Sequence, residues 1–169
     1  LGAAHARLLA VFAEQGNVGP AGEWLLDNFH VVREHILEVN ESLPSGYYRE
    51  LPELTRGTLT GFPRVYEIAI ALISHTEGRI DLDNVDLFVS AFQQVTPLSI
   101  GELWAIPAML RLGLLESIRR MSLRSVQRLD EVERADEWAH RIQSANESGT
   151  DELGEMLRTF VSARHALTP

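Results

Sequence analysis

The sequence lacks both cysteine and lysine, and each absence excludes a class of chemistry. With no Cys among its 169 residues, the chain can form no disulfide, bind no metal through thiolates and use no Cys nucleophile. All 15 basic residues are Arg. Schiff-base catalysis and phosphate binding by a P-loop Lys are therefore excluded as well.

Positive charge and long apolar runs are also scarce. The formal net charge is -9, whereas a nucleic-acid-binding protein needs a basic surface, so we expect no nucleic-acid partner. The longest nearly apolar stretch, Val65 to Ile73, is far shorter than the roughly 18 residues of a membrane-spanning helix. We therefore expect a soluble segment with no membrane span of its own.

The chain begins at Leu1 instead of Met, and no signal peptide precedes the first apolar pattern. We interpret it as a fragment of a longer protein. Its length and its hydrophobic content of 45% suit one domain, residues 1–169, large enough for a hydrophobic core.

Apolar residues recur at helical spacing along most of the chain, which predicts an all-α fold, a single bundle of about six helices. The clearest stripe runs from Leu25 to Leu43 in alternating four- and three-residue steps. Two Pro and three Gly interrupt the pattern over residues 43–61, which predicts one long irregular loop with at most a helical turn at 51–56. Short connections elsewhere favour antiparallel neighbours. The predicted helices cover residues 3–15, 20–42, 62–76, 81–95, 99–145 and 151–166.

The strongest local signal is the start of the helix at residue 99. Ser99 followed by Glu102 forms a capping-box pattern, and Leu98 with Leu103 has the spacing of a hydrophobic staple. Pro107 falls inside this helix and is predicted to kink or loosen it.

No pattern of a metal site or a catalytic site is present. Asp27 and His30 lie one turn apart, but a surface or capping role suits His30 better than metal binding. Residues 57–61 contain two glycines without the Lys or the preceding strand of a nucleotide loop, and are predicted to form a turn. We expect no catalytic residue, no metal and no cofactor. The nearest carboxylate pairs are interpreted as solvated charges: Glu50 and Glu53, Asp81 and Asp83, and Glu131 and Glu133.

A carbohydrate-contacting surface is the one binding function that the residues suggest. Tyr47, Tyr48 and Arg49 lie together in the predicted loop, where aromatic rings could stack on a sugar and Arg could bond its hydroxyls. The structural alternative is that both Tyr pin the loop to the bundle, while Arg49 pairs with a carboxylate such as Glu102 or caps a helix end.

The same two interpretations apply to three more residues. Trp104 is either a core anchor or a sugar platform. Arg64 and Tyr66, at a helix start beside the Gly-rich loop, either clamp that loop or contact sugar. The full set of candidates is Tyr47, Tyr48, Arg49, Arg64, Tyr66, Glu102 and Trp104.

Several longer stretches resemble a known family. In order, they cover residues 23–30 (EWLLDNFH), 43–52 (LPSGYYRELP) and 97–105 (PLSIGELWA), with GFPRVY and His75-Thr76 between the last two. Their order and spacing resemble the region ahead of the catalytic parts of cyclic β-1,2-glucan synthases. The resemblance covers about residues 20–125.

The resemblance implies a large, multi-domain bacterial enzyme of the inner membrane, whose glycosyltransferase part uses UDP-glucose and whose phosphorylase-like part trims chain length. Neither part's catalytic motif occurs in these 169 residues, so no catalytic residue is carried over. The role expected for this segment is a non-catalytic scaffold on the cytoplasmic side, docked on other domains of the same polypeptide. Two alternatives remain: a module that guides the glucan chain, and a free-standing helical protein-interaction module.

Overall fold

The computed structural model describes the backbone of residues 1–148 and 150–165, and the side chains of residues 1–144 and 154–162. These residues form seven helices, which confirms the all-α prediction. Over the same residues the extended pairing is limited to one isolated antiparallel bridge between Glu53 and Pro63. The helices are α1 (Gly2–Gln15), α2 (Gly19–Ser42), α3 (Ser45–Glu50), α4 (Arg64–His75), α5 (Leu82–Val95), α6 (Ile100–Ser148) and α7 (Thr150–His165).

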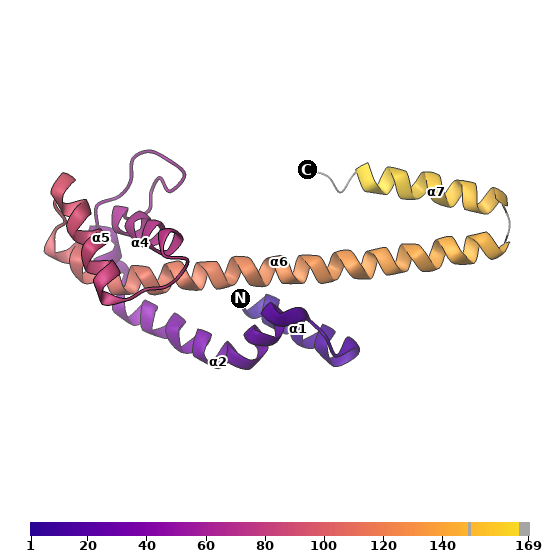
Figure 1. Ribbon diagram of the computed structural model, residues 1–169, viewed down its shortest axis with the longest axis horizontal. Coiled ribbons are helices and arrows are strands. Elements are labelled where there is room, and N and C mark those ends of the chain that lie inside the picture. Colours follow the sequence, from indigo (N-terminus) through magenta and orange to yellow (C-terminus); the bar gives the residue numbers. More distant parts are fainter. Residues whose placement is uncertain (149, 166–169) are drawn as a thin grey trace.

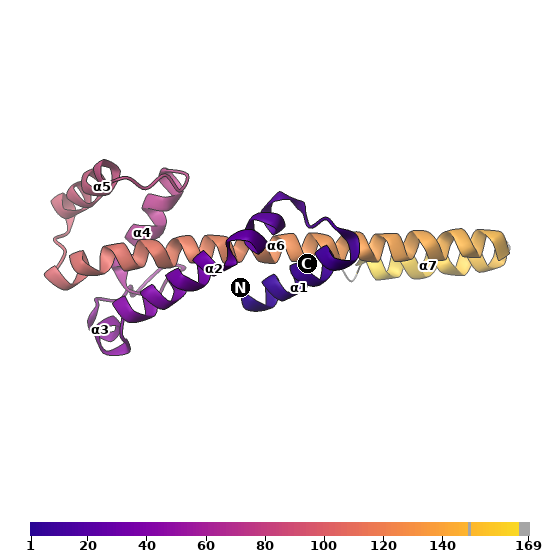
Figure 2. The same cartoon turned by 90° about the horizontal axis from the view of Figure 1, so that it is seen from below.

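Helix α6 is the axis of the molecule. Its 49 residues extend over about 74 Å at the usual rise of an α-helix. Figure 1 shows α1 and α2 along one side of α6, α4 and α5 on the other side near its start, and α7 folded back along its far end. The view from below in Figure 2 shows the same arrangement. Helices α1, α2, α4 and α7 are thus positioned by their contact with α6, whereas α5 packs on α4.

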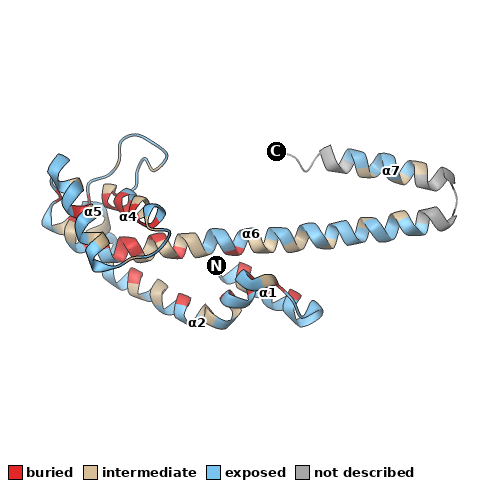
Figure 3. Cartoon of the chain, in the orientation of Figure 1, coloured by how far each residue is buried: buried red, intermediate tan, exposed pale blue. Residues whose placement is uncertain are grey.

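The first hydrophobic core lies between α4, α5 and the first turns of α6. Helix α4 contributes Val65, Ala69 and Leu72, which share one face because they are three or four residues apart. Met109 of α6 is fully buried against them. Figure 3 shows this concentration of buried residues on α4 and on the start of α6.

The second core lies between α1, α2 and the middle of α6. On α2 the buried residues Leu25, Val32 and Val39 recur every seven positions, which produces the narrow stripe of a helix that lies along another helix. Leu8 of α1 and Leu115 of α6 complete this core. The predicted stripe on residues 20–42 is therefore the face that α2 packs on α6.

Charged pairs at the surface connect the same helices. Arg7 of α1 bonds Asp130 at 2.8 Å and Glu133 at 2.6 Å on α6. Arg111 of α6 lies 3.2 Å from Glu38 of α2. All five side chains are at least one-third exposed, so each pair adds little stability compared with the two cores.

The segment 43–61 differs from the predicted irregular loop. Residues 45–50 form the short helix α3, which begins directly after Pro44. The predicted helical turn at 51–56 is wrong, because this stretch is held in a hairpin-like arrangement. Leu54 donates its N–H to Phe62 O at 2.8 Å, and Gly61 donates to Leu54 O at 2.9 Å.

Helix α6 differs from its prediction at its far end. It continues through Pro107, and the kink or loosening expected there stays a prediction. Pro107 is exposed, so water can satisfy the carbonyl that its missing N–H leaves free. The loop predicted from Ser144 is helical as far as Ser148, while residue 149 and the side chain of Thr150, a predicted cap, lie outside the described residues.

Candidate functional site

The start of α6 has the capping box that its sequence predicts. Ser99 N donates to Glu102 Oε2 at 2.9 Å, and Glu102 N donates to Ser99 Oγ at 3.3 Å. Leu98 and Leu103, the predicted staple, both pack in the first core. The first turn of α6 is therefore fixed by reciprocal hydrogen bonds and by apolar contact.

Arg64 binds the same carboxylate from the first turn of α4. Its Nε donates to Glu102 Oε1, and its Nη2 donates to Glu102 Oε2 at 2.8 Å and to Pro97 O at 2.9 Å. The Glu102 side chain is fully buried. Because the Arg64 hydrogen bonds and those from Ser99 outweigh burial, the pKa of Glu102 is lowered. Glu102 is a charged structural group, and Arg64 clamps the 97–99 turn instead of the Gly-rich loop.

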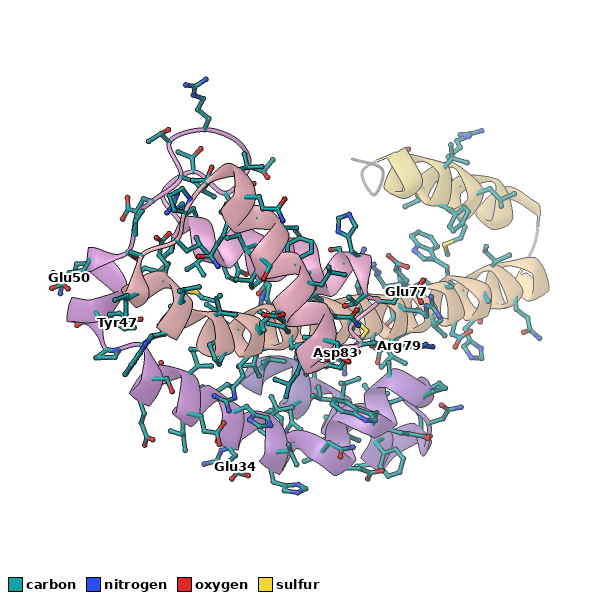
Figure 4. All side chains as sticks on the ribbon, turned by 60° about the vertical axis from the view of Figure 1, so that its left-hand side comes forward. Glu34, Tyr47, Glu50, Glu77, Arg79 and Asp83 are labelled. Atoms are coloured by element: carbon teal, nitrogen blue, oxygen red, sulfur yellow. The ribbon has the colours of Figure 1, made fainter. Side chains whose placement is uncertain are left out.

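The tyrosines of α3 are half-buried against the first core. Tyr47 donates its hydroxyl to Gly101 O, and Figure 4 shows it between α3 and the start of α6. Arg49 does not bind Glu102, one of the partners considered for it; its Nε donates to Ser45 O at 3.0 Å, one turn earlier. The Glu102 partner is Arg64, which approaches from α4 with both nitrogens. These contacts agree with the structural interpretation of Tyr47 and Tyr48.

Trp104 is not a core anchor, because its side chain points away from the core and is 81% exposed. The buried face of α6 in this turn carries Glu102, Ala105 and Met109. Ile100, one turn before Trp104, is 76% exposed, and Val95 at the end of α5 is 86% exposed. We call these three residues, Val95, Ile100 and Trp104, the Trp104 surface.

A groove of about 580 Å³ lies between α2, the turn before α4, α4 itself and α6. Its walls are largely apolar and include Ile36 of α2, Phe62, Tyr66 and Ile70 near or on α4, and Leu112 of α6. Of the seven candidate residues for sugar contact, only Tyr66 lines it. The other six candidates lie outside the lining of this groove.

Tyr66 is a largely buried residue in the wall of this groove. Only 7% of the residue is exposed, and its ring stacks on Phe62 at a centroid distance of 5.5 Å. Its hydroxyl has no hydrogen-bond partner among the residues that the structure describes. Burial and then the nearby Glu116 carboxylate raise the pKa of Tyr66, so the phenol stays protonated at neutral pH.

The edge of the groove on α6 is charged. Glu116 accepts hydrogen bonds from Arg119 Nε at 2.6 Å and Nη2 at 2.8 Å, and Arg120 Nε lies 3.7 Å from it. The pKa of Glu116 is lowered, first by its bonds with Arg119. Asn40 of α2 also lines the groove. This edge therefore carries hydrogen-bond donors, the two Arg, and an acceptor, Glu116. The amide of Asn40 can do either.

No sequence pattern indicates this groove. Glu116 and Arg119 are three residues apart, which indicates an ion pair on the surface of a helix. This spacing does not show that residues of α2 and α4 lie opposite them. Phe62, Asn40 and Arg120 carry no signal of their own. Only the packing of residues distant in sequence brings them together.

Asp81, a member of one of the predicted carboxylate pairs, has a structural role. Asp81 caps α5 by accepting from Asn84 N at 2.8 Å. In the described part of the chain, no cluster of three or more His, Asp or Glu side chains could bind a metal ion. None of the described helices is long and apolar enough to cross a membrane.

The chain is similar to a known protein over most of its length. No protein-family model matches the chain, and no solved structure matches it. The chain is 38% identical over 143 residues to the cyclic β-(1,2)-glucan synthase NdvB of Rhizobium meliloti strain 1021, a match that covers 83% of this chain and 5% of NdvB. The chain therefore spans about a twentieth of that relative, and it is related to a region of a cyclic β-(1,2)-glucan synthase.

Proposed function

We propose that this chain is a non-catalytic helical segment of a cyclic β-(1,2)-glucan synthase-like enzyme, which docks through the Trp104 surface on other parts of the same polypeptide. Glucosyl transfer would take place outside these residues. The match to NdvB covers most of this chain but only 5% of NdvB. This small share supports a catalytic part that lies elsewhere in the enzyme. The parent enzyme would lie in the bacterial inner membrane, with this segment on the cytoplasmic side.

The observation that carries the docking role is the exposure of three large apolar side chains at one end of the molecule. Val95, Ile100 and Trp104 are each at least three-quarters exposed. A cluster of exposed apolar residues favours an interaction surface, and Trp is the residue type most enriched at the centres of interfaces. Because this chain is related to about one-twentieth of a larger enzyme, the rest of such an enzyme would be the nearest partner for this surface.

The charges of the described residues support a non-catalytic role. A carboxyl that acts as a general acid at neutral pH needs a raised pKa. Among the described residues, the carboxyls with a shifted pKa are Glu38, Glu102 and Glu116, and all three are shifted downward by hydrogen bonds to His35, Arg64 and Arg119 respectively. Each of these carboxylates already has a structural partner.

A photo-crosslinking amino acid at position 104 tests this proposal in cells that express the complete reading frame. Leu37 of α2 is also a large apolar residue and is 59% exposed, so the same substitution at position 37 is a matched control. We expect the crosslinked peptides from position 104 to join it to segments of the same polypeptide outside residues 1–169, at a yield well above that from position 37.

Two results would contradict the docking role. One is a reading frame that ends directly after Pro169, which would favour the free-standing interaction module. The other is a crosslinking yield at position 104 no higher than at position 37, which would mean that the Trp104 surface faces water in the complete protein.

A further inference from the structure

The groove between α2, α4 and α6 has the size and lining of a ligand site. Its volume of about 580 Å³ lies within the ~300–1,000 Å³ that small-molecule sites occupy. Its walls are aliphatic and aromatic, while its charged groups gather at one edge on α6 and Asn40 of α2 adds an amide. A ligand that fits this lining has an apolar face and a polar edge.

The hydroxyl of Tyr66 is the group that the fold itself leaves unused. The residue is more than nine-tenths buried, it lines the groove, and its hydroxyl lacks a partner within the described part of the chain. Tyr47, by contrast, donates its hydroxyl to Gly101 O. No buried side-chain oxygen or nitrogen lacks a partner among the described residues, so the Tyr66 hydroxyl itself opens onto the groove, where it can donate to a ligand or to water.

Phe62 provides the flat apolar surface beside this hydroxyl. Its ring stacks on Tyr66 with an interplanar angle of 27°, and 43% of the residue remains exposed. The C–H face of a pyranose ring packs on such a surface, and its hydroxyls lie at the ring edge. Arg119, Arg120 and Asn40 can reach hydroxyls at the polar edge of the groove.

The charge at the edge favours a neutral ligand over an anion. Glu116 lies in the same wall as the two Arg and is paired with both. An anionic ligand would have to compete with this carboxylate for the guanidinium groups. It would also approach a chain whose formal net charge is -9. A polyhydroxyl ligand can use the same donors and acceptors without separating the pairs.

We infer that this groove is a glucan subsite, in which Phe62 supports the C–H face of a β-1,2-linked glucosyl residue and the Tyr66 hydroxyl donates to a sugar oxygen. The choice of glucan rests on the proposed function, because the related enzyme is named for cyclic β-(1,2)-glucan. The subsite lies on α4 and α6, apart from the Trp104 surface. It would hold a passing stretch of glucan chain and would not cleave or transfer it.

Titration of the chain with short linear β-1,2-linked glucan oligosaccharides, followed by amide chemical shifts in NMR, tests the inference. We expect saturable shifts at millimolar ligand, confined to residues 36–40, 59–70 and 112–120. Tyr66→Phe removes only the hydroxyl and should weaken binding about three- to tenfold, as the loss of one hydrogen bond does. Phe62→Ala should weaken it further.

Two control variants separate this site from the other candidates. Tyr47→Phe makes the same chemical change at a hydroxyl outside the groove, and Trp104→Ala removes the most exposed aromatic candidate. Both should bind the oligosaccharides as the unchanged chain does. Oligosaccharides with β-1,4 linkage should bind at least several-fold more weakly, because their linkage gives successive glucosyl rings a different relative orientation.

The inference is overturned if no groove residue shifts at millimolar glucan, if Tyr66→Phe binds as tightly as the unchanged chain, or if β-1,4-linked oligosaccharides bind equally well. Failure of Phe62→Ala to fold, seen as loss of the helical circular dichroism signal, leaves Tyr66→Phe to decide. Crosslinking at position 104 addresses a different surface, so loss of the glucan subsite and loss of the docking role give different results.

Discussion

Arg64, in the first turn of α4, holds both carboxylate oxygens of Glu102, in the first turn of α6. The two residues are 38 positions apart, and the same carboxylate also closes the capping box with Ser99. A single fully buried carboxylate therefore connects two helix starts and the turn at Pro97. This part of the fold depends on one charge.

Replacing Glu102 by Gln should destabilise the protein strongly. The change leaves the Arg64 guanidinium, which is three-quarters buried, without its counter-charge and weakens the capping box. Breaking such a pair from one side costs about 3 kcal/mol. Urea unfolding measures the effect. Glu23→Gln, at an exposed position on α2, should change the free energy of unfolding by less than about 0.5 kcal/mol, and equal effects of the two substitutions would contradict the assignment.

Acid should remove the contribution of Glu102. Its pKa is lower in the folded than in the unfolded chain, so the carboxylate adds stability that is fully present above the ordinary Glu pKa of about 4.3. This stability is lost as the pH falls through the lower folded pKa. Urea midpoints measured between neutral pH and pH 3 should fall less steeply in Glu102→Gln. Parallel curves for the two proteins would show that Glu102 does not titrate in this way.

Two substitutions on α6 should differ greatly in their effect on the free energy of unfolding. Trp104→Ala removes a side chain that is 81% exposed and should change the free energy of unfolding by less than about 0.5 kcal/mol. Met109→Ala, five residues later, empties a fully buried position and should cost about 3 kcal/mol. Thermal or urea unfolding of the two variants measures the contrast. A large loss from Trp104→Ala would mean that its ring is packed against the protein.

The close approach of α4 and α6 at Gly113 predicts a third effect on stability. A Cβ atom there would lie 2.6 Å from Ile73 Cδ1 and 3.2 Å from Ile70 Cδ1. Gly113→Val therefore overfills the contact and should cost about 2 kcal/mol. Gly101→Val is the matched control, because the nearest atom to a Cβ there is Tyr47 Cε2 at 3.8 Å, and it should cost clearly less in the same unfolding assay.

The parts of the fold that depend on local pattern could be predicted from the sequence. The stripe that includes Leu25, Val32 and Val39 became the buried face of α2, and the Ser99–Glu102 capping box formed as expected. In both cases the interacting residues lie within a few turns of one helix, so their spacing alone defines the contact.

The parts that depend on contacts between distant residues could not be predicted in the same way. The exposure of Trp104 follows from which side of α6 meets α4, and Glu102 is bound by Arg64 because the start of α4 lies beside the start of α6. The groove around Tyr66 combines residues from α2, α4 and α6. Residue types and spacing within one helix do not contain this information.

The continuity of α6 also restricts how the length of this chain can change. Glu133 is bound to Arg7 of α1, while Trp138, farther along the same helix, contacts Phe160 of α7 with ring centroids 5.3 Å apart. Inserting a single residue between Glu133 and Trp138 would rotate α7 by about 100° around the axis of α6. Inserting seven residues would restore its angular position to within about 20°. Tolerated insertions in this stretch should therefore come in whole helical turns.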